Sequence, residues 1–433
     1  MAEVRALNGI RYSPRFVNEL ADVICPPYDI ISPQLQGELY GYSPYNFVRV
    51  EYGQESAADS SSDNRYTRAA ATLDNWLKTG VMTADASPSI YLHDHYFRHG
   101  GRQFKRRGII ARVRLEEWHR MVVRPHEGTL SGPKSDRINL LRALRANTSP
   151  VLSMYQDSGG AVARILAKAE NGSPAAQSRP LDGEWHELRA ITDAHEIALI
   201  TAALADVPLY IADGHHRYES AMVYKREQEA VHPGDAEAPF NFVMMTLVAF
   251  DDPGLLILPP HRLLRGLSAA RLEDIKRELP AFFDVKKLPQ DGAAWRRLDE
   301  WQREAGKERL AVYGLDGDNF WLLTLRDFEA AARFMPGFHT EIYKRMDVSL
   351  VDHIILEKIL GIQPDGHTGI AFNYDREDSV KKVKAGEYQL AFIIKPVVPE
   401  TIKDISDAQD RMPRKSTYFY PKLPSGLVVN RLI

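Results

Sequence analysis

The chain has 433 residues, of which 44% are hydrophobic and 26% are charged, and its formal net charge is −3. This balance is ordinary for a globular protein, and it excludes a uniformly basic surface of the kind that coats nucleic acid. The single cysteine, Cys25, excludes an intrachain disulfide framework and a cysteine-based zinc cluster.

A soluble cytoplasmic protein without a membrane partner is expected by elimination. The longest mostly apolar run covers residues 243–250, which is far shorter than the ~20 residues of a membrane-spanning helix. Residues 1–16 contain no apolar segment typical of a signal peptide.

The N-terminal third is predicted to contain turns, a strand, a helix and a hairpin. Residues 23–32 place a Pro-Pro turn beside a Tyr-Asp pair, and residues 46–53 have the composition of a strand. Residues 66–80 have apolar side chains at helical spacing and end in a glycine, which predicts a helix. The Gly-Gly pair within residues 98–102 predicts a hairpin between two strands.

The middle of the chain is predicted to form a helix that Pro150 ends, a strand over residues 151–157, and then a helix, a strand and a second helix in close succession. Asp193 and Glu196 have capping-box spacing at the start of the first helix of that succession. Residues 209–212 form the predicted strand, and the second helix begins just after Asp213.

The C-terminal part is predicted to alternate hairpins, a helix and a strand. The predicted hairpins pair residues 241–250 with 255–258 and residues 310–315 with 320–325, the amphipathic helix covers 349–362, and the strand covers 388–397. The absence of regular strand–helix–strand spacing favours an α+β fold with mixed sheets and flanking helices. Three regions are expected, over residues 1–157, 158–265 and 266–433.

Asp213-Gly-His-His-Arg217 is the strongest functional motif. Gly214 allows a sharp turn between strand and helix, and the helix start offers unpaired N–H groups and the positive end of the dipole. His215, His216 and Arg217 add donors, and Asp213 is suited to hold a metal or position a hydroxyl. The alternative is a helix cap with a structural turn, but the complete motif favours a phosphate site.

A second candidate is Arg124-Pro-His-Glu-Gly-Thr129. Glu127 is suited to accept a proton from an alcohol, His126 to orient it, and Thr129 to donate from its hydroxyl. A charged surface turn is the alternative interpretation.

A third candidate covers residues 412–422, where Lys415, Ser416 and Thr417 resemble the tip of a phosphate loop. Arg414, Lys415 and Lys422 of this segment flank Tyr418, Phe419 and Tyr420, a mixture that would also suit stacking on bases or a half-buried strand. Neither a P-loop nor a dinucleotide-binding glycine motif occurs in the sequence. His93 and His95 share one face of a predicted strand, interpreted as a solvated face, and no metal ligands are assigned.

With these motifs in hand, the chain resembles the uncharacterised family known as domain of unknown function 1015. The segments that carry the resemblance are CPPYDIIS, RPHEGT with KSDR, ADGHHRYESA, VDHIILEKILGI and MPRKSTYFYPKLPSG, which span nearly the whole chain. More distantly, DGHHRYESA is similar to the helix-start motif of the ParB/sulfiredoxin-like superfamily, which binds nucleotide phosphates in partition-type CTPases and free-serine kinases.

That second resemblance implies a ParB/sulfiredoxin-like core with large insertions, Glu127 as catalytic base, and Asp213–Arg217 as phosphate cradle. We therefore expect a phosphotransferase acting on a small hydroxylated metabolite such as serine. Its phosphate donor would be a nucleotide (ATP or ADP) or pyrophosphate, with Mg²⁺ expected from the chemistry. Lys415, Ser416 and Thr417 would complete one composite site. The alternatives are a nucleotide-gated module with a nucleic-acid partner, which is not favoured, and a phosphate-ester hydrolase.

Overall fold

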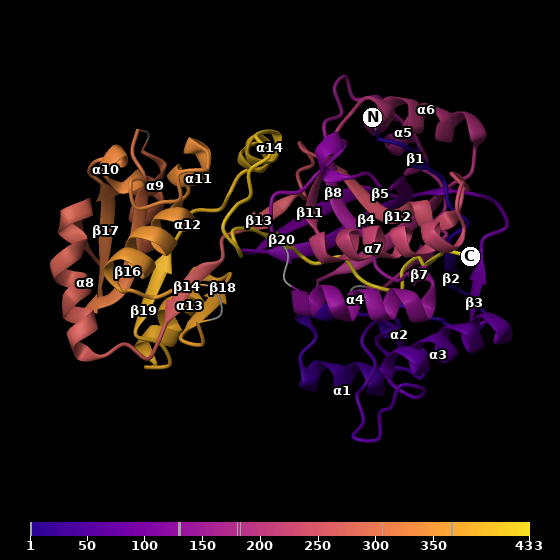
Figure 1. The fold of residues 1–433 in the computed structure, drawn as a ribbon, viewed down its shortest axis with the longest axis horizontal. Helices are drawn as coiled ribbons and strands as arrows, with labels where there is room; N and C mark the ends of the chain where they lie inside the picture. Colours follow the sequence, from indigo (N-terminus) through magenta and orange to yellow (C-terminus); the bar gives the residue numbers. More distant parts are fainter. Residues whose placement is uncertain (1, 129–130, 180, 182, 305, 365–366) are drawn as a thin grey trace. The chain divides into compact units, whose positions relative to one another are not determined.

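The computed structural model describes residues 2–128, 131–179, 181, 183–304, 306–364 and 367–433, and these residues form two compact units (Figure 1). The first unit comprises Met1–Pro125, Thr129–Leu256 and Pro421–Ile433, and the second comprises His126–Gly128 and Ile257–Tyr420. The three regions expected from the sequence, and the composite site, stay predictions.

The first unit is built on a mixed sheet with the strand order β6-β11-β8-β12-β5-β4-β10-β9, to which β1 adds beside β5. β6 runs parallel to β11 and β8 parallel to β12, whereas the other neighbours are antiparallel. The strands of this sheet are β1 (Val4–Arg5), β4 (Ile90–His99), β5 (Arg102–Arg114), β6 (Val123–Arg124), β8 (Val151–Tyr155), β9 (Ala176–Gln177), β10 (Trp185–Ile191), β11 (Leu209–Asp213) and β12 (Phe242–Ala249).

Alternation along the strands gives this sheet a core on each face. Ile109, Ala111 and Val113 of β5 pack into one apolar cluster, whereas Ile110 packs into the other. Successive side chains of a strand point to opposite faces, so both faces must be covered by helices. The helices are α1 (Pro33–Tyr42), α2 (Val48–Glu51), α3 (Arg65–Thr79), α4 (Ser131–Leu144), α5 (Ala161–Ala169), α6 (Ala194–Ala205) and α7 (His215–Val231), with short 3-10 turns at η1 (Leu20–Asp22), η2 (Tyr28–Ile30), η3 (Trp118–Arg120) and η4 (Pro239–Asn241).

Helices α3, α4 and α7 form a continuous packed series, in which α3 contacts α4 and α4 contacts α7 (Figure 1). The small strand pairs of this unit join segments that are far apart in the sequence. β2 (Ile10–Tyr12) pairs with β3 (Met82–Ala84), and β7 (Ala146–Asn147) pairs with β21 (Asn430–Arg431). The chain therefore returns to the first unit after completing the second.

The second unit has an antiparallel sheet with the order β15-β17-β16-β19-β14-β18. Its strands are β14 (His261–Leu264), β15 (Phe283–Pro289), β16 (Arg309–Asp316), β17 (Asn319–Leu325), β18 (Ile370–Asn373) and β19 (Leu390–Ile393), and a separate pair joins β13 (Leu256–Leu258) to β20 (Tyr418–Tyr420). The helices are α8 (Ala269–Phe282), α9 (Ala294–Arg303), α10 (Phe328–Ala332), α11 (Glu341–Arg345), α12 (Asp347–Ser349), α13 (Arg376–Lys384), α14 (Pro399–Asp407) and the π-helix η5 (Leu350–Ile359).

The expected α+β class with mixed sheets and flanking helices is confirmed, and so are most of the individual elements. α3 ends at Gly80, whose φ of 80° is left-handed, and the Gly-Gly hairpin joins β4 to β5. The Asp193 side chain caps α6 by accepting from the Glu196 amide at 2.8 Å. β16 and β17 pair as expected.

Three expected elements are wrong. Residues 46–53 form the short helix α2 rather than a strand, because Phe47, Val48 and Val50 are all buried and do not alternate. The 255–258 segment does not pair with β12, since β13 pairs with β20 instead. The helix expected over 349–362 is π-helical at η5, and its residues are buried nearly all round rather than on one face.

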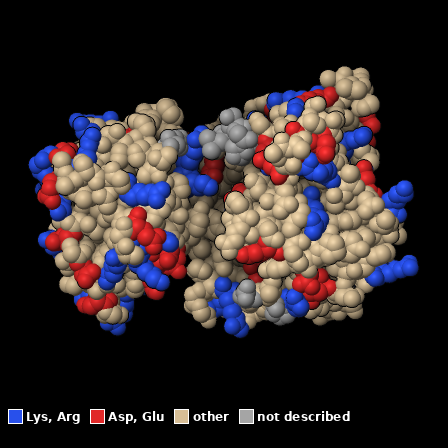
Figure 2. Space-filling view, turned by 90° about the horizontal axis from the view of Figure 1, so that it is seen from below, with Lys and Arg blue, Asp and Glu red and all other residues tan. Residues whose placement is uncertain are grey.

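Among the described residues, no helix has both the length and the apolar character needed to cross a membrane. On the face that Figure 2 shows, acidic and basic side chains are interspersed on each unit. That mixture agrees with the near-zero net charge.

Candidate functional site

The first candidate lies in the first unit, where β11 turns into α7. β11 ends at Asp213, Gly214 has a φ of 92°, and α7 begins at His215. Glycine is needed here for two reasons: this φ strains any residue with a Cβ, and an added Cβ would lie 2.8 Å from Arg217 Nε. The strand, turn and helix predicted for this motif are thus confirmed.

Asp213 is the centre of an ion cluster. Arg217 Nη2 donates to Asp213 Oδ2 at 2.6 Å, and Lys422 Nζ donates to Asp213 Oδ1. Lys422 also lies 3.7 Å from Asp29 Oδ2. Burial opposes ionisation of Asp213, but the charges of Lys422 and Arg217 outweigh it and lower its pKa. The carboxyl is therefore an anion that two protein cations compensate.

Arg217 is folded back on the protein. Besides Asp213, it donates from Nη1 to the Pro150 carbonyl at 2.6 Å. Its Nε is buried and has no hydrogen-bond acceptor among the residues that the structure describes. Arg217 is one of the residues that line a small cavity of about 40 Å³. His215 is buried at the start of α7, and His216 beside it is half-buried.

Two further motifs of the sequence meet near this turn. The Arg137 guanidinium lies 3.9 Å from the centre of the Tyr28 ring and donates to Glu51 Oε1 at 3.0 Å. Thr148 Oγ1 donates to the second Glu51 oxygen at 2.6 Å. Burial raises the pKa of Tyr28 to about 12, with Arg137 opposing the shift. Sequence reasoning assigned no role to these residues, although CPPYDIIS and KSDR contain two of them.

The second candidate lies in the second unit. His126 is fully buried, and its Nε2 lies 3.1 Å from Thr417 Oγ1. Thr417 Oγ1 donates to Glu127 Oε1 at 3.4 Å. For the threonine hydroxyl to donate to Glu127, its oxygen must accept from the His126 N–H. His126 was expected to orient Glu127; His126 Nε2 lies 4.0 Å from Glu127 Oε1, and the Thr417 hydroxyl lies within hydrogen-bond distance of both residues.

The other residues of the 412–417 turn behave differently from one another. Lys415 is exposed and has a left-handed φ of 54°. Ser416 is buried, and its hydroxyl donates to the Pro413 carbonyl at 2.5 Å, so its side chain points inward. Thr129 lies outside the described residues. Of the site residues predicted from the sequence, the structure brings together His126, Glu127 and Thr417 in one unit, and Asp213–Arg217 in the other.

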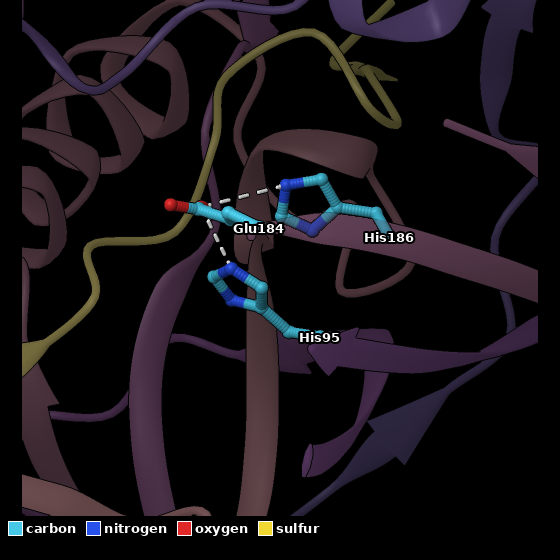
Figure 3. A group of neighbouring side chains, drawn as sticks. All are labelled: His95, Glu184 and His186. Carbon is cyan, nitrogen blue, oxygen red and sulfur yellow. Dashed lines mark hydrogen bonds and ion pairs between the residues drawn. The ribbon is translucent and has the colours of Figure 1, made fainter. Parts of the chain in front are cut away.

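A cluster of His95, Glu184 and His186 has the composition of a metal site (Figure 3). His95 Nε2 lies 2.8 Å from Glu184 Oε1, and Arg106 Nη2 lies 2.9 Å from His95 Nδ1. Because arginine can only donate, Nδ1 accepts, and the neutral ring carries its proton on Nε2. That leaves His95 no lone pair for a metal, and the buried Arg106 charge repels one.

The expectation that His93 and His95 lie on a solvated strand face is wrong. They are 2% and 1% exposed, and burial holds the pKa of each well below the usual value for histidine. His93 Nε2 lies 3.1 Å from His186 Nδ1, which extends the hydrogen-bonded chain. The cluster is a buried polar network of the sheet.

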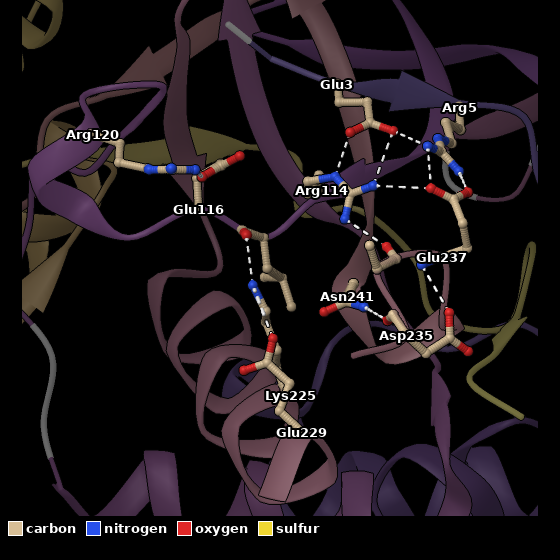
Figure 4. A network of polar contacts seen from close by, with 12 residues as sticks. Glu3, Arg5, Arg114, Glu116, Arg120, Lys225, Glu229, Asp235, Glu237 and Asn241 are labelled. Atoms are coloured by element: carbon tan, nitrogen blue, oxygen red, sulfur yellow. Dashed lines mark hydrogen bonds and ion pairs between the residues drawn. The ribbon is translucent and has the colours of Figure 1, made fainter. Parts of the chain in front are cut away.

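A larger cavity of about 350 Å³ lies beside the second half of α7. Figure 4 shows the polar contacts of the side chains around it. Its charged side chains pair among themselves or with neighbours: Arg114 with Glu3, and Arg120 with Glu116. Lys225 donates to the Leu115 carbonyl at 3.3 Å. None of the site residues predicted from the sequence lines this cavity, which lies roughly 20 Å along α7 from the Gly214 turn.

A family model described as "Protein of unknown function (DUF1015)" matches residues 4–349. No curated protein matches the sequence. A free serine kinase in complex with AMP is similar at a TM-score of 0.35 and 15% identity, covering 73% of this chain and 90% of the kinase.

Two further solved structures are similar to the same degree. A conserved hypothetical protein from Pyrococcus furiosus has a TM-score of 0.34 at 15% identity, covering 73% of this chain and 94% of its own. SbnI with a C-terminal truncation, from Staphylococcus aureus, has a TM-score of 0.34 at 8% identity, covering 72% and 84%.

Proposed function

The chain belongs to the protein family of unknown function DUF1015, and we propose that it is a nucleotide- or phosphate-binding phosphotransferase that acts on a small hydroxylated metabolite such as serine. The donor would be ATP, ADP or pyrophosphate. The Gly214 turn is assigned the role of binding phosphate, and Glu127 the role of accepting the proton of the alcohol.

The observation that carries the proposal is the hydrogen-bonded series His126–Thr417–Glu127. His126 and Glu127 are neighbours in the sequence, whereas Thr417 lies 290 positions after Glu127. Glu127 is partly exposed, with 24% of its side chain accessible, whereas His126 is fully buried. A carboxylate held by a buried hydrogen-bonding series and open to solvent on one side is suited to take the proton of an attacking alcohol.

The start of α7 supports phosphate binding. α7 is 17 residues long, and the N–H groups and dipole at the N-terminus of a helix favour anions. Arg217 and Lys422 are the neighbouring cations, both about nine-tenths buried, and Arg217 Nε has no acceptor among the described residues. A phosphate at this turn would give that donor a partner.

Mg²⁺ is expected from phosphoryl-transfer chemistry, but Asp213 does not fit a magnesium ligand as arranged here. One of its oxygens accepts from Arg217 and the other from Lys422. The proposal therefore assigns no magnesium ligand among the residues of this turn.

The test measures phosphorylation of free serine and a panel of small alcohols with ATP, ADP and pyrophosphate. Glu127→Gln is expected to lower kcat by about 10²–10⁴-fold, because it removes a general base. Arg217→Ala is expected to raise the KM for the donor by at least about tenfold, as loss of a charge-assisted phosphate contact predicts.

Matched controls are Glu117→Gln and Arg226→Ala, which break an exposed ion pair that includes the same helix α7. Both controls should keep wild-type rates. The kinase proposal is rejected if the wild type phosphorylates none of the alcohols, or if the site variants are as fast as the controls. Phosphate release without acceptor would indicate the hydrolase alternative. Salt-dependent binding of DNA or RNA would indicate the nucleic-acid module.

A further inference from the structure

The turn over residues 412–417, which contains Lys415 and Thr417, accepts hydrogen bonds from a buried arginine of the second unit that is paired with an aspartate. We infer that Arg262 and Asp352 are positioning residues, which fix this turn so that the Thr417 hydroxyl lies between His126 and Glu127. The catalytic role inferred for this turn rests on the proposed function, whereas the hydrogen bonds that fix the turn are present in the structure.

Arg262 lies on β14 and is 1% exposed. Its Nη1 donates to the Lys415 carbonyl at 2.9 Å, and its Nη2 donates to the Arg414 carbonyl at 3.2 Å. Nη1 also donates to the Pro260 carbonyl at 2.7 Å, which ties the turn to β14. One rigid guanidinium thus grips two successive carbonyls of the turn.

Asp352 supplies the countercharge. Its two oxygens lie 3.3 and 3.4 Å from Arg262 Nε and Nη2. Asp352 belongs to η5, the π-helix within VDHIILEKILGI. π-Helical turns are rare and are often found at functional sites. The pair therefore gives this motif of the sequence, which the proposed reaction steps do not use, a role.

The grip accounts for the backbone of Lys415. A left-handed backbone is unfavourable for a residue other than glycine, and Lys415 has a φ of 54°. Two successive carbonyls can point to one side when the residue between them is helical in either hand. The hydrogen bonds to Arg262 are made in this conformation, and so offset its cost.

The turn is also fixed at its other points. The Met412 amide donates to the His126 carbonyl at 2.8 Å, and the Ser416 hydroxyl donates to the Pro413 carbonyl at 2.5 Å. The only side-chain hydroxyl of the turn left to face His126 and Glu127 is that of Thr417. If the carbonyls of residues 414 and 415 were released, the hydroxyl would lose its fixed place.

The experiment compares Arg262→Lys with Arg309→Lys. Arg309 is a matched control, because it is also buried in the second unit and its Nη1 also donates to two carbonyls, those of Trp301 and Glu304. A lysine keeps the charge but cannot make the fork of hydrogen bonds. Asp352→Asn is a second, milder variant in case Arg262→Lys folds poorly.

Two quantities are measured. Hydrogen exchange of a peptide covering residues 412–418, without ligand, should be at least tenfold faster in Arg262→Lys and unchanged in Arg309→Lys. In the serine phosphorylation assay, Arg262→Lys should lower kcat at least tenfold while the KM for the donor changes less than threefold. Asp352→Asn should shift both quantities in the same direction.

Unchanged exchange over residues 412–418 in Arg262→Lys would overturn the inference, and so would faster exchange with a wild-type kcat. If the wild type has no phosphotransferase activity, the proposed function fails by itself. The exchange measurement then still decides whether Arg262 holds the turn.

Discussion

At the scale of single residues, the ionic balance around Asp213 governs the candidate phosphate site. One carboxylate receives two cations, and the Lys422 ammonium is shared with a second carboxylate, Asp29. An incoming phosphate must therefore compete with Asp213 for Arg217 and Lys422. This arrangement holds both cations in place before a ligand arrives.

Lys422→Met is expected to destabilise the first unit by roughly 3 kcal/mol, because it leaves a buried carboxylate short of a partner. The control is Lys287→Met, which breaks an ion pair with Asp316 whose side chains are 57% and 42% exposed, against 10% and 17% for Lys422 and Asp213. That control should cost less than about 1 kcal/mol. Urea unfolding at pH 7 measures both, and equal losses would contradict the prediction.

The free energy of unfolding that Lys422→Met loses should also depend on pH. The folded pKa of Asp213 is lowered, so its contribution is present above the unfolded pKa of about 3.9 and is lost as pH falls below it. The folded pKa of Lys422 is raised, so its contribution is present below about 10.4 and is lost as pH rises through the folded pKa. The difference between wild type and Lys422→Met should be level from about pH 5 to 9, and should shrink below pH 4.

At the scale of elements, the junction of β11 and α7 depends on its glycine. Gly214→Ala introduces a left-handed alanine, and its Cβ would meet the Arg217 guanidinium at 2.8–2.9 Å. Gly234→Ala is the control, since Gly234 has a similar φ of 89° but nothing within 4 Å of the added Cβ.

Both alanine variants should lose roughly 1 kcal/mol to the backbone. Only Gly214→Ala should also displace Arg217 from Asp213, and so reduce pyrophosphate binding in calorimetry. Equal pyrophosphate affinity in the two variants would show that Arg217 adjusts without consequence.

Sequence patterns predicted correctly those elements that are determined by interactions between neighbouring residues. Capping at Asp193, the glycine stop after α3 and the Asp213-Gly214 junction depend on neighbouring residues, so the sequence carried them. The strand expected over residues 46–53 was wrong because a short, mostly buried segment has no clear alternation of buried and exposed residues. The π-helical form of η5 was missed because hydrophobic spacing predicts a helix without fixing which carbonyl each amide reaches.

The residues of the candidate site could be predicted from the sequence, but the contacts between them could not. His126, Glu127 and Thr417 were identified by chemical type, and the structure joins them. The threonine between histidine and glutamate, the inward Ser416 hydroxyl and the Arg262 grip depend on the path of the backbone. Asp29 and Tyr28 lie in a motif with no obvious chemistry of its own, so only their proximity to Lys422 and Arg137 reveals them.

At the scale of the whole molecule, residues 421–433 belong to the first unit although they follow the second unit in the sequence. β21 pairs with β7, and Ser425 and Val429 make backbone bridges to Cys25 and Ile10. The buried apolar residues of the segment are Leu423, Leu427, Val428, Val429 and Leu432. At about 1.5–3 kcal/mol each, their burial is comparable to the whole stability of a domain.

A variant that ends at Tyr420 should therefore lose the first unit while keeping the second. Limited proteolysis is expected to cut rapidly within residues 1–256 and to leave residues 257–420 protected. Removal of Ile433 alone, which is 65% exposed, is the control and should leave the pattern unchanged. Equal protection of residues 1–256 in the two variants would contradict the prediction.

Because the chain returns to the first unit at its end, the two units are completed in a fixed order during synthesis. At about 5–20 residues per second, a ribosome needs roughly 10–30 s to make residues 257–420 before it reaches residue 421. Throughout that interval, β7 of the nascent first unit has no partner strand, and the apolar surface that residues 421–433 cover is exposed. Asp213 also lacks its ion-pair partner Lys422. The second unit can be completed first, which reverses the usual order in which N-terminal parts of a nascent chain mature. During that interval, the incomplete first unit is the part of the chain that chaperones would need to shield.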